Sequence, residues 1–151
     1  MWSEVEIGSN RIRNTRVILR VGGRDMVSLV RGTRDDQLLL TAEVYDHTGI
    51  HVGRLRRNAW LINADDRFEL TTAPKDLALR DKESGELLLH ARVVDKDRIS
   101  IPDAIFYTPK GSKIVVTPEG ITFPGNNRLI GNTFESIGGA AINFDEVSPG
   151  S

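Results

Sequence analysis

The chain has 151 residues and an almost balanced charge, with 20 lysines and arginines against 21 aspartates and glutamates, and it contains no cysteine. The absence of cysteine excludes disulfides, thiolate zinc sites, iron–sulfur ligation and a cysteine nucleophile. This length suits a single domain, 1–151, with a core of its own. The first residues carry two acids and lack the apolar stretch of a secretory signal, and no run approaches the roughly 20 apolar residues of a membrane span, so we expect a cytoplasmic protein.

The N-terminal part of the chain, 1–36, is rich in arginine and is predicted to form strands over 16–21 and 26–30. Residues 1–67 hold eleven arginines, nine acids and no lysine, whereas 68–151 hold nine bases and twelve acids. Arginine suits flat, bidentate contacts with carboxylate or phosphate groups, so nucleic-acid binding through the N-terminal half is one alternative function. The near-zero net charge and the aromatic content of 6% argue against it, because neither a basic footprint nor a stacking platform is evident.

The middle of the chain, 37–123, alternates short apolar runs with Gly, Asp and Pro, which predicts an all-β fold built from hairpins. No window of twelve residues combines helical apolar spacing with a cap and a stop, so we expect little helix. The strands predicted in this region cover 38–45, 50–55, 68–71, 77–80, 86–94, 98–101, 105–108, 113–117 and 121–123.

Three hairpin turns in this region share one pattern. An Asp or Thr precedes a glycine by three or four residues in 46–49, 81–85 and 117–120, and the three glycines lie 36 and 35 residues apart. We expect a positive φ at each glycine, with the earlier polar side chain accepting a hydrogen bond from the turn backbone. The spacing predicts three copies of one hairpin unit, although two similar intervals also arise by chance.

The C-terminal segment, 124–145, follows a different pattern, with apolar residues at 129, 134, 137, 142 and 144 and with Asn and Gly at the corners between them. This pattern resembles one coil of the right-handed parallel β-helix of pectate-lyase-like and tailspike proteins. The resemblance implies inward aliphatic side chains that stack between coils, and asparagine ladders at the turns. Residues 38–144 also resemble uncharacterised bacterial all-β modules in which a D-x-x-G turn precedes an Asn- and Gly-rich end. The expected fold is therefore a set of hairpin repeats that leads into a β-helix-like coil, with a β-sandwich as the alternative.

A single coil cannot bury its own apolar face, so the C-terminal coil must pack on other strands or on another subunit. Leu129, Phe134, Ile137 and Ile142 would form its inward stack. We expect a second subunit or another protein to cover the open edge of this coil, which makes a homo-oligomer the leading hypothesis. The alternative is that the N-terminal strands fold back and cap the coil within the monomer.

Asp46, His47 and His51 surround the first glycine turn. Two histidines and a carboxylate would serve a metal-dependent enzyme if their side chains met across the hairpin. Histidines in turns and on strand surfaces are the more common explanation of such a pattern, because the spacing spans a turn and not a helix. We therefore expect no metal and no other cofactor.

Arg54, Arg56 and Arg57 form a basic run within and just after the second arm of this hairpin. Such a run suits an acidic partner or a phosphate, and it also occurs on solvated strand edges that discourage unwanted pairing. The sequence contains no nucleophile elbow of the G-x-S-x-G type, no phosphate-binding glycine loop and no calcium loop. We therefore expect a non-catalytic binding or self-assembly module rather than an enzyme, with a partner that the sequence does not specify.

Overall fold

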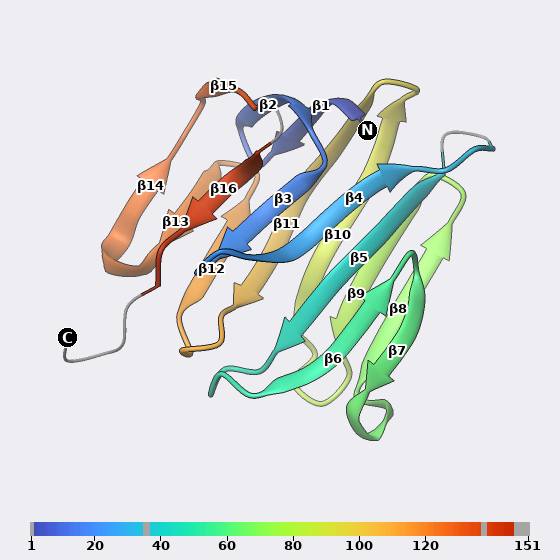
Figure 1. Ribbon diagram of the computed structural model, residues 1–151, viewed down its shortest axis with the longest axis vertical. Coiled ribbons are helices and arrows are strands. Elements are labelled where there is room, and N and C mark those ends of the chain that lie inside the picture. Colours follow the sequence, from blue (N-terminus) through green and yellow to red (C-terminus); the bar gives the residue numbers. More distant parts are fainter. Residues whose placement is uncertain (1, 35–36, 137–138, 147–151) are drawn as a thin grey trace.

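The computed structural model describes residues 2–34, 37–136 and 139–146. Strands account for 67% of the structure and helical turns for 4%, which confirms the predicted all-β fold. Two mixed sheets, neither of them closed, lie face to face (Figure 1). Within the described ranges, no helix has the length and apolar character that crossing a membrane requires.

The first sheet contains ten strands and branches at its longest one. Its strands are β1 (Trp2–Ile7), β2 (Asn10–Thr15), β8 (Phe68–Ala73), β9 (Asp76–Asp81), β10 (Leu87–Asp95), β11 (Arg98–Tyr107), β12 (Lys113–Thr117), β13 (Gly120–Phe123), β14 (Asn127–Leu129) and β15 (Thr133–Glu135). β11 pairs with β10 along one edge, and two strands share its other edge. β1 runs parallel to residues 98–101, and β12 runs antiparallel to residues 104–107. The sheet continues from this branch to β2 and β15 on one arm and to β13 and β14 on the other.

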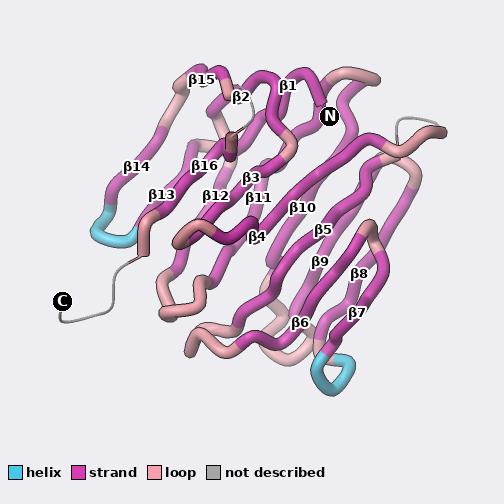
Figure 2. The backbone as a smooth tube through the Cα atoms, viewed as in Figure 1, coloured by secondary structure: helices cyan, strands magenta, loops and turns pink. Residues whose placement is uncertain are grey.

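The second sheet contains six strands in the spatial order β16, β3, β4, β5, β6, β7. Their bounds are β3 (Val17–Val21), β4 (Arg24–Arg31), β5 (Leu38–Tyr45), β6 (His51–Arg56), β7 (Ala59–Asn63) and β16 (Ala140–Phe144). The chain crosses from β7 to β8, and so from the second sheet to the first, through the helical turn η1 (Ala64–Asp66). A second helical turn, η2 (Pro124–Asn126), joins β13 to β14; both turns are cyan in Figure 2.

Alternation along the strands places one face of each sheet in a shared core. In β5, Leu38, Leu40, Ala42 and Val44 are buried, while the residues between them face outward. The buried apolar residues form one cluster to which both sheets contribute. A fully covered Leu or Val stabilises the fold by roughly 1.5–3 kcal/mol, so this cluster is the main force that holds the facing sheets together.

The sequence pattern does not predict β1, β2 or β7, and β2 shows why. Its inward positions are Asn10, Ile12 and Thr15, of which two are polar, so the apolar alternation is hidden. Asn10 is fully buried because its side chain is satisfied: Nδ2 donates to the carbonyl of Leu129 at 2.9 Å, and Oδ1 accepts from the N–H of Asn132 at 3.0 Å. A polar residue faces the core stably when its hydrogen bonds are complete.

The C-terminal segment, 124–145, is divided between the two sheets instead of stacking as one coil. β14 pairs antiparallel with β13, β15 pairs parallel with β2, and β16 pairs parallel with β3. Without β15 and β16, the outer edges of β2 and β3 would be open. Their unpaired backbone N–H and C=O groups would then lack hydrogen-bond partners, which favours pairing with another extended segment. The N-terminal strands therefore cover two of the three C-terminal strands within the monomer, which is the alternative to coverage by a second subunit.

Candidate functional site

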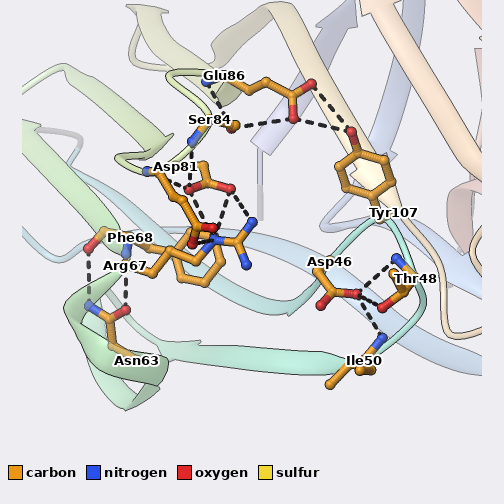
Figure 3. Close-up of polar contacts among 11 residues, drawn as sticks. Asp46, Thr48, Ile50, Asn63, Arg67, Phe68, Asp81, Ser84, Glu86 and Tyr107 are labelled. Carbon is orange, nitrogen blue, oxygen red and sulfur yellow. Dashed lines mark hydrogen bonds and ion pairs between the residues drawn. The ribbon is translucent and has the colours of Figure 1, made fainter.

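One end of the molecule carries a polar cleft of about 260 Å³, which we call the end cleft and which contains most of the residues in Figure 3. The end of β5, the start of β8, the turn between β9 and β10, and the end of β11 form its walls. The lining residues are Tyr45, Asp46, His47, Arg67, Phe68, Asp81, Glu83, Ser84, Glu86, Leu88 and Tyr107. Four carboxylates and one guanidinium make the end cleft acidic, so its capacity for a ligand depends on whether these groups are already engaged.

An ion pair between Arg67 and Asp81 lies at the centre of the end cleft (Figure 3). Arg67 donates from Nη2 at 2.8 Å and from Nε at 3.0 Å to the carboxylate of Asp81, which is buried. The N–H groups of Glu83 and Ser84 donate to the same carboxylate at 2.9 and 3.4 Å. Burial by itself would raise the pKa of Asp81, but the hydrogen bonds from Arg67 and from the turn outweigh it and hold the pKa below its ordinary value.

The other carboxylates that Figure 3 shows in the end cleft also have partners. Oδ1 of Asp46 accepts from the N–H groups of Thr48 and Ile50, at 2.9 and 3.0 Å, and from the Thr48 hydroxyl at 2.6 Å. Burial opposes the charge of Asp46, but these bonds outweigh it and lower the pKa. Glu86 accepts from the hydroxyl of Tyr107 at 3.2 Å, and desolvation together with this nearby carboxylate raises the pKa of Tyr107.

These hydrogen bonds give the carboxylates of Asp46 and Asp81 a structural role, because each of them holds the backbone of the turn that follows it. The turns contain Gly49 and Gly85, which have φ values of 89° and 77°, as the sequence pattern predicts. The polar residue before each glycine accepts hydrogen bonds from the turn backbone, which confirms that part of the prediction. The prediction is wrong for Gly120, whose φ is not positive; glycine is needed there because a Cβ would meet the carbonyl oxygen of Leu129. The three hairpins therefore do not share one geometry.

The three residues of the alternative metal-dependent site have different surroundings. Nε2 of His51 lies 2.5 Å from Oε2 of Glu43, and its ring packs against Tyr45 with the centroids 5.1 Å apart. Asp46 is committed to the turn backbone, and His47 is exposed at the rim of the end cleft. Among the described residues, no group of three or more His, Cys, Asp or Glu side chains is placed to hold a metal ion. The geometry thus gives no support to a metal-dependent site at Asp46, His47 and His51.

A second concave surface lies on the outer face of the six-stranded sheet, and we call it the arginine groove. Its volume is about 610 Å³, and it contains all three arginines of the predicted basic run. The lining residues are Val30, Arg31, Thr41, Glu43, Arg54, Leu55, Arg56, Arg57 and Leu61. Four guanidinium groups against one carboxylate give the lining of the arginine groove a positive formal charge, although the chain as a whole has a net charge of −1.

The arginines of the groove differ in what they contact. Nε of Arg54 lies 2.8 Å from Oε1 of Glu43. Arg31 forms an ion pair with Asp97, with 3.5 Å between Nη1 and Oδ1, and its guanidinium carbon lies 5.7 Å from the centroid of the Trp2 ring. The guanidinium groups of Arg56 and Arg57 have no hydrogen-bond or ion-pair partner in the described part of the chain. These two cations are therefore available to a partner.

The turn between β6 and β7 places Arg57 on the outer face. Arg57 and Asn58 have φ values of 50° and 66°, which is the mirror-image turn that suits a two-residue hairpin. The Asn58 side chain fixes this turn on β5, because Oδ1 accepts from the N–H of Leu40 at 2.7 Å and Nδ2 donates to the carbonyl of Leu38 at 2.8 Å. The backbone N–H of Arg57 donates to the hydroxyl of Thr41 at 3.2 Å. The turn is thus held rigidly while its arginine side chain points away from the core.

The predicted residues of the C-terminal stack lie in different places. Ile142 is buried in the core and pairs with Leu19, whereas Leu129 is half-buried and lies in the other sheet. Phe134 is 39% exposed on β15, and Ile137 lies outside the described residues. The structure therefore does not bring the described members of this set into one inward row.

Comparison with protein-family models, with curated proteins and with solved structures finds no match to this chain. A functional proposal therefore rests on the chemistry of the end cleft and of the arginine groove.

Proposed function

We propose that this chain is a non-catalytic binding module whose arginine groove takes an acidic segment of a partner protein. The observation that carries the proposal is the pair of guanidinium groups of Arg56 and Arg57, which have no partner among the described residues and lie in one open groove with Arg54. A planar guanidinium forms paired, charge-assisted hydrogen bonds with a carboxylate, so a free pair of them suits closely spaced Asp or Glu side chains.

A protein partner fits the arginine groove better than a nucleic acid does. Glu43 lies among the arginines and interrupts the positive surface, which suits separate carboxylates on a peptide better than the continuous phosphate backbone of a nucleic acid. Val30 and Leu61 add apolar surface to the groove, and its lining contains no aromatic side chain on which a base would stack. Mixed apolar and basic surface of this kind suits a peptide segment with both acidic and apolar residues.

The proposal also takes the fold to be a β-sandwich, which presents the arginine groove on a rigid outer face. One buried cluster to which both sheets contribute supports this architecture over a β-helix. The division of β14, β15 and β16 between the two sheets supports it as well. A module of this kind offers its partner a preformed surface, which reduces the entropy lost on binding.

The proposal is tested by fluorescence anisotropy with a fluorescein-labelled peptide that contains several glutamates. The double variant Arg56→Gln, Arg57→Gln should weaken binding about tenfold or more, and added salt should weaken the wild-type complex. The matched control is Arg16→Gln, Arg24→Gln, which removes the same charge from exposed positions outside the arginine groove. Equal losses in the two double variants, or tighter binding of a single-stranded oligonucleotide than of the peptide, would contradict the proposal.

Self-assembly through the C-terminal segment is the second candidate function. β14 and β15 each pair on one side only among the described strands, and Ile130 and Phe134 next to these edges are 56% and 39% exposed. Exposed apolar residues beside open strand edges favour pairing with another chain. Sedimentation equilibrium should then show a dimer or larger assembly that Phe134→Asp dissociates. A wild-type protein that stays monomeric at high concentration would rule out this candidate.

A further inference from the structure

The strand β7 is an open edge beside the arginine groove. It is the last strand of its sheet, it pairs with β6, and its backbone has no other strand partner in the described ranges. An open edge presents a row of N–H and C=O groups that can pair with another extended chain. Charged side chains, proline or a covering loop usually block such an edge, but β7 reads Ala59-Trp60-Leu61-Ile62-Asn63 and carries neither charge nor proline.

A β-bulge gives β7 an exposed apolar pair on the groove side. Arg54 pairs with Ile62 and Leu55 pairs with Trp60, so Leu61 is an extra residue in the ladder. Trp60 turns inward and stacks on Phe68 of the other sheet, with the ring centroids 6.2 Å apart. Leu61 and Ile62 remain 57% and 44% exposed, which is unusual for two consecutive residues of a strand. The bulge thus places two adjacent aliphatic side chains at the edge of a basic surface.

The small side chain of Ala59 leaves a path from this edge to the arginines. Ala59 lies opposite Arg56 in the ladder, and it is exposed. A strand added to β7 would run about 10 Å from β6, since neighbouring strands lie about 4.8 Å apart. An arginine and a glutamate side chain together span this distance, and nothing larger than a methyl group stands between them at Ala59.

We propose that the acidic segment binds as an additional strand along the free edge of β7. Two of its carboxylates, at alternate positions, reach Arg56 and Arg57, and an apolar side chain on the same face packs on Leu61 and Ile62. Backbone pairing supplies affinity, and the alternate side chains supply selectivity. This inference rests on the proposed function, because the same arginines attract the partner in both.

The test uses the full chain and a fluorescein-labelled peptide with Glu, Glu and Val at alternate positions and Thr between them. Two further peptides carry N-methyl groups, one at the Glu and Val residues and the other at the Thr residues. In a paired strand only one of these two sets of N–H groups faces β7. One methylated peptide should therefore lose at least about tenfold in affinity while the other binds like the parent. Hydrogen exchange should slow at β7 amides when the parent peptide is bound.

The outcomes separate the two proposals. If both methylated peptides bind like the parent, or lose affinity equally, strand addition is wrong; the proposed function still holds if Arg56→Gln, Arg57→Gln weakens binding. If the parent peptide does not bind, or if the arginine variant binds it as well as the wild type does, the proposed function itself fails. Leu61→Ser adds a second criterion, because it removes the apolar contact without adding charge: it should weaken the parent peptide but leave the unfolding transition nearly unchanged at this exposed position.

Discussion

Asn58 determines the position of the groove arginines, because its side chain forms two hydrogen bonds with β5 and its backbone adopts a left-handed conformation. We expect Asn58→Ala to lower the free energy of unfolding by about 2 kcal/mol, since two backbone groups lose their partners and Ala resists a positive φ. Asn58→Gly should cost less, because glycine adopts this φ freely and only the hydrogen bonds are lost. Urea unfolding measures both changes.

Asn143→Ala is the control for this prediction. Asn143 is exposed on β16 and has no side-chain hydrogen bond among the described residues, so its replacement should change the stability by less than about 0.5 kcal/mol. A similar loss in both asparagine variants would mean that the bonds from Asn58 to β5 contribute nothing specific.

The ion pair between Arg67 and Asp81 should make the stability of the fold depend on pH. Because the folded state lowers the pKa of Asp81, its contribution is present above the ordinary pKa of about 4 and is lost as the pH falls through the folded value. Arg67→Met leaves a buried carboxylate without its cation, so we expect a loss of about 3 kcal/mol at pH 7.

Urea unfolding between about pH 2 and pH 7 tests this prediction. The difference between the wild type and Arg67→Met should shrink as the medium becomes acidic, because Asp81 is then neutral in both proteins. Asp81→Asn should have a flatter stability profile than the wild type over the same range. A destabilisation by Arg67→Met that is constant with pH would show that the loss comes from packing alone.

At the scale of elements, the hairpin turns need glycine for two different reasons. A Cβ on Gly85 would meet nothing within 4 Å, so Gly85→Ala should cost about 1 kcal/mol from its positive φ alone. Gly49→Ala should cost more, because the same strain is joined by a contact with the carbonyl oxygen of Pro109. Gly120→Ala should loosen β14, whose Leu129 carbonyl occupies the space of the new Cβ. Thermal unfolding measures each cost.

Gly139→Ala serves as the control for the glycine series. Its φ is ordinary, and a Cβ there would lie 3.5 Å from the hydroxyl of Ser136, a normal van der Waals distance. We expect almost no change in its melting temperature. If Gly85→Ala also has no effect, the positive φ of that turn is not a constraint on the sequence.

The same glycines show what the sequence can predict. The turns at Gly49 and Gly85 follow from local pattern, since an Asp acceptor and a glycine within a few residues determine the geometry. The need for glycine at 120 depends on a carbonyl that another strand supplies, and no local pattern contains that information. The arginine groove divides in the same way: its basic run is visible in the sequence, but Arg31 and Leu61 join it only through the register of β4 to β7.

At the scale of the whole molecule, the C-terminal strands contribute unequally to stability. Ile142 is 5% exposed in the core, so Ile142→Ala should cost about 3 kcal/mol through lost burial and a new cavity. Phe134→Ala should cost less than about 1 kcal/mol, because its side chain is already partly in solvent on an edge strand. Chemical denaturation of the two variants measures both losses of stability. A larger loss for Phe134→Ala than for Ile142→Ala would contradict the greater burial of Ile142.

Alternation of apolar residues predicts an all-β chain, but it does not predict which strands become neighbours. The parallel pairing of β1 with β11 joins residues more than ninety positions apart, and the pairings of β15 with β2 and of β16 with β3 span still longer distances. Such contacts leave no periodic trace in the sequence, because any strand with one apolar face suits any open edge of matching register. The pairings of β15 with β2 and of β16 with β3 are parallel, and the local pattern of 124–145 does not specify either partner.

The enclosure of the first strands by the last ones has a consequence for synthesis on the ribosome. β1 and β2 emerge first, yet β1 must wait for β11, and β2 and β3 must wait for β15 and β16, before their outer edges are covered. At about 5–20 residues per second, the nascent chain carries these open edges for on the order of 10 s. During this time the exposed charged residues Arg11 and Arg13 of β2 disfavour pairing of its open outer edge with another chain.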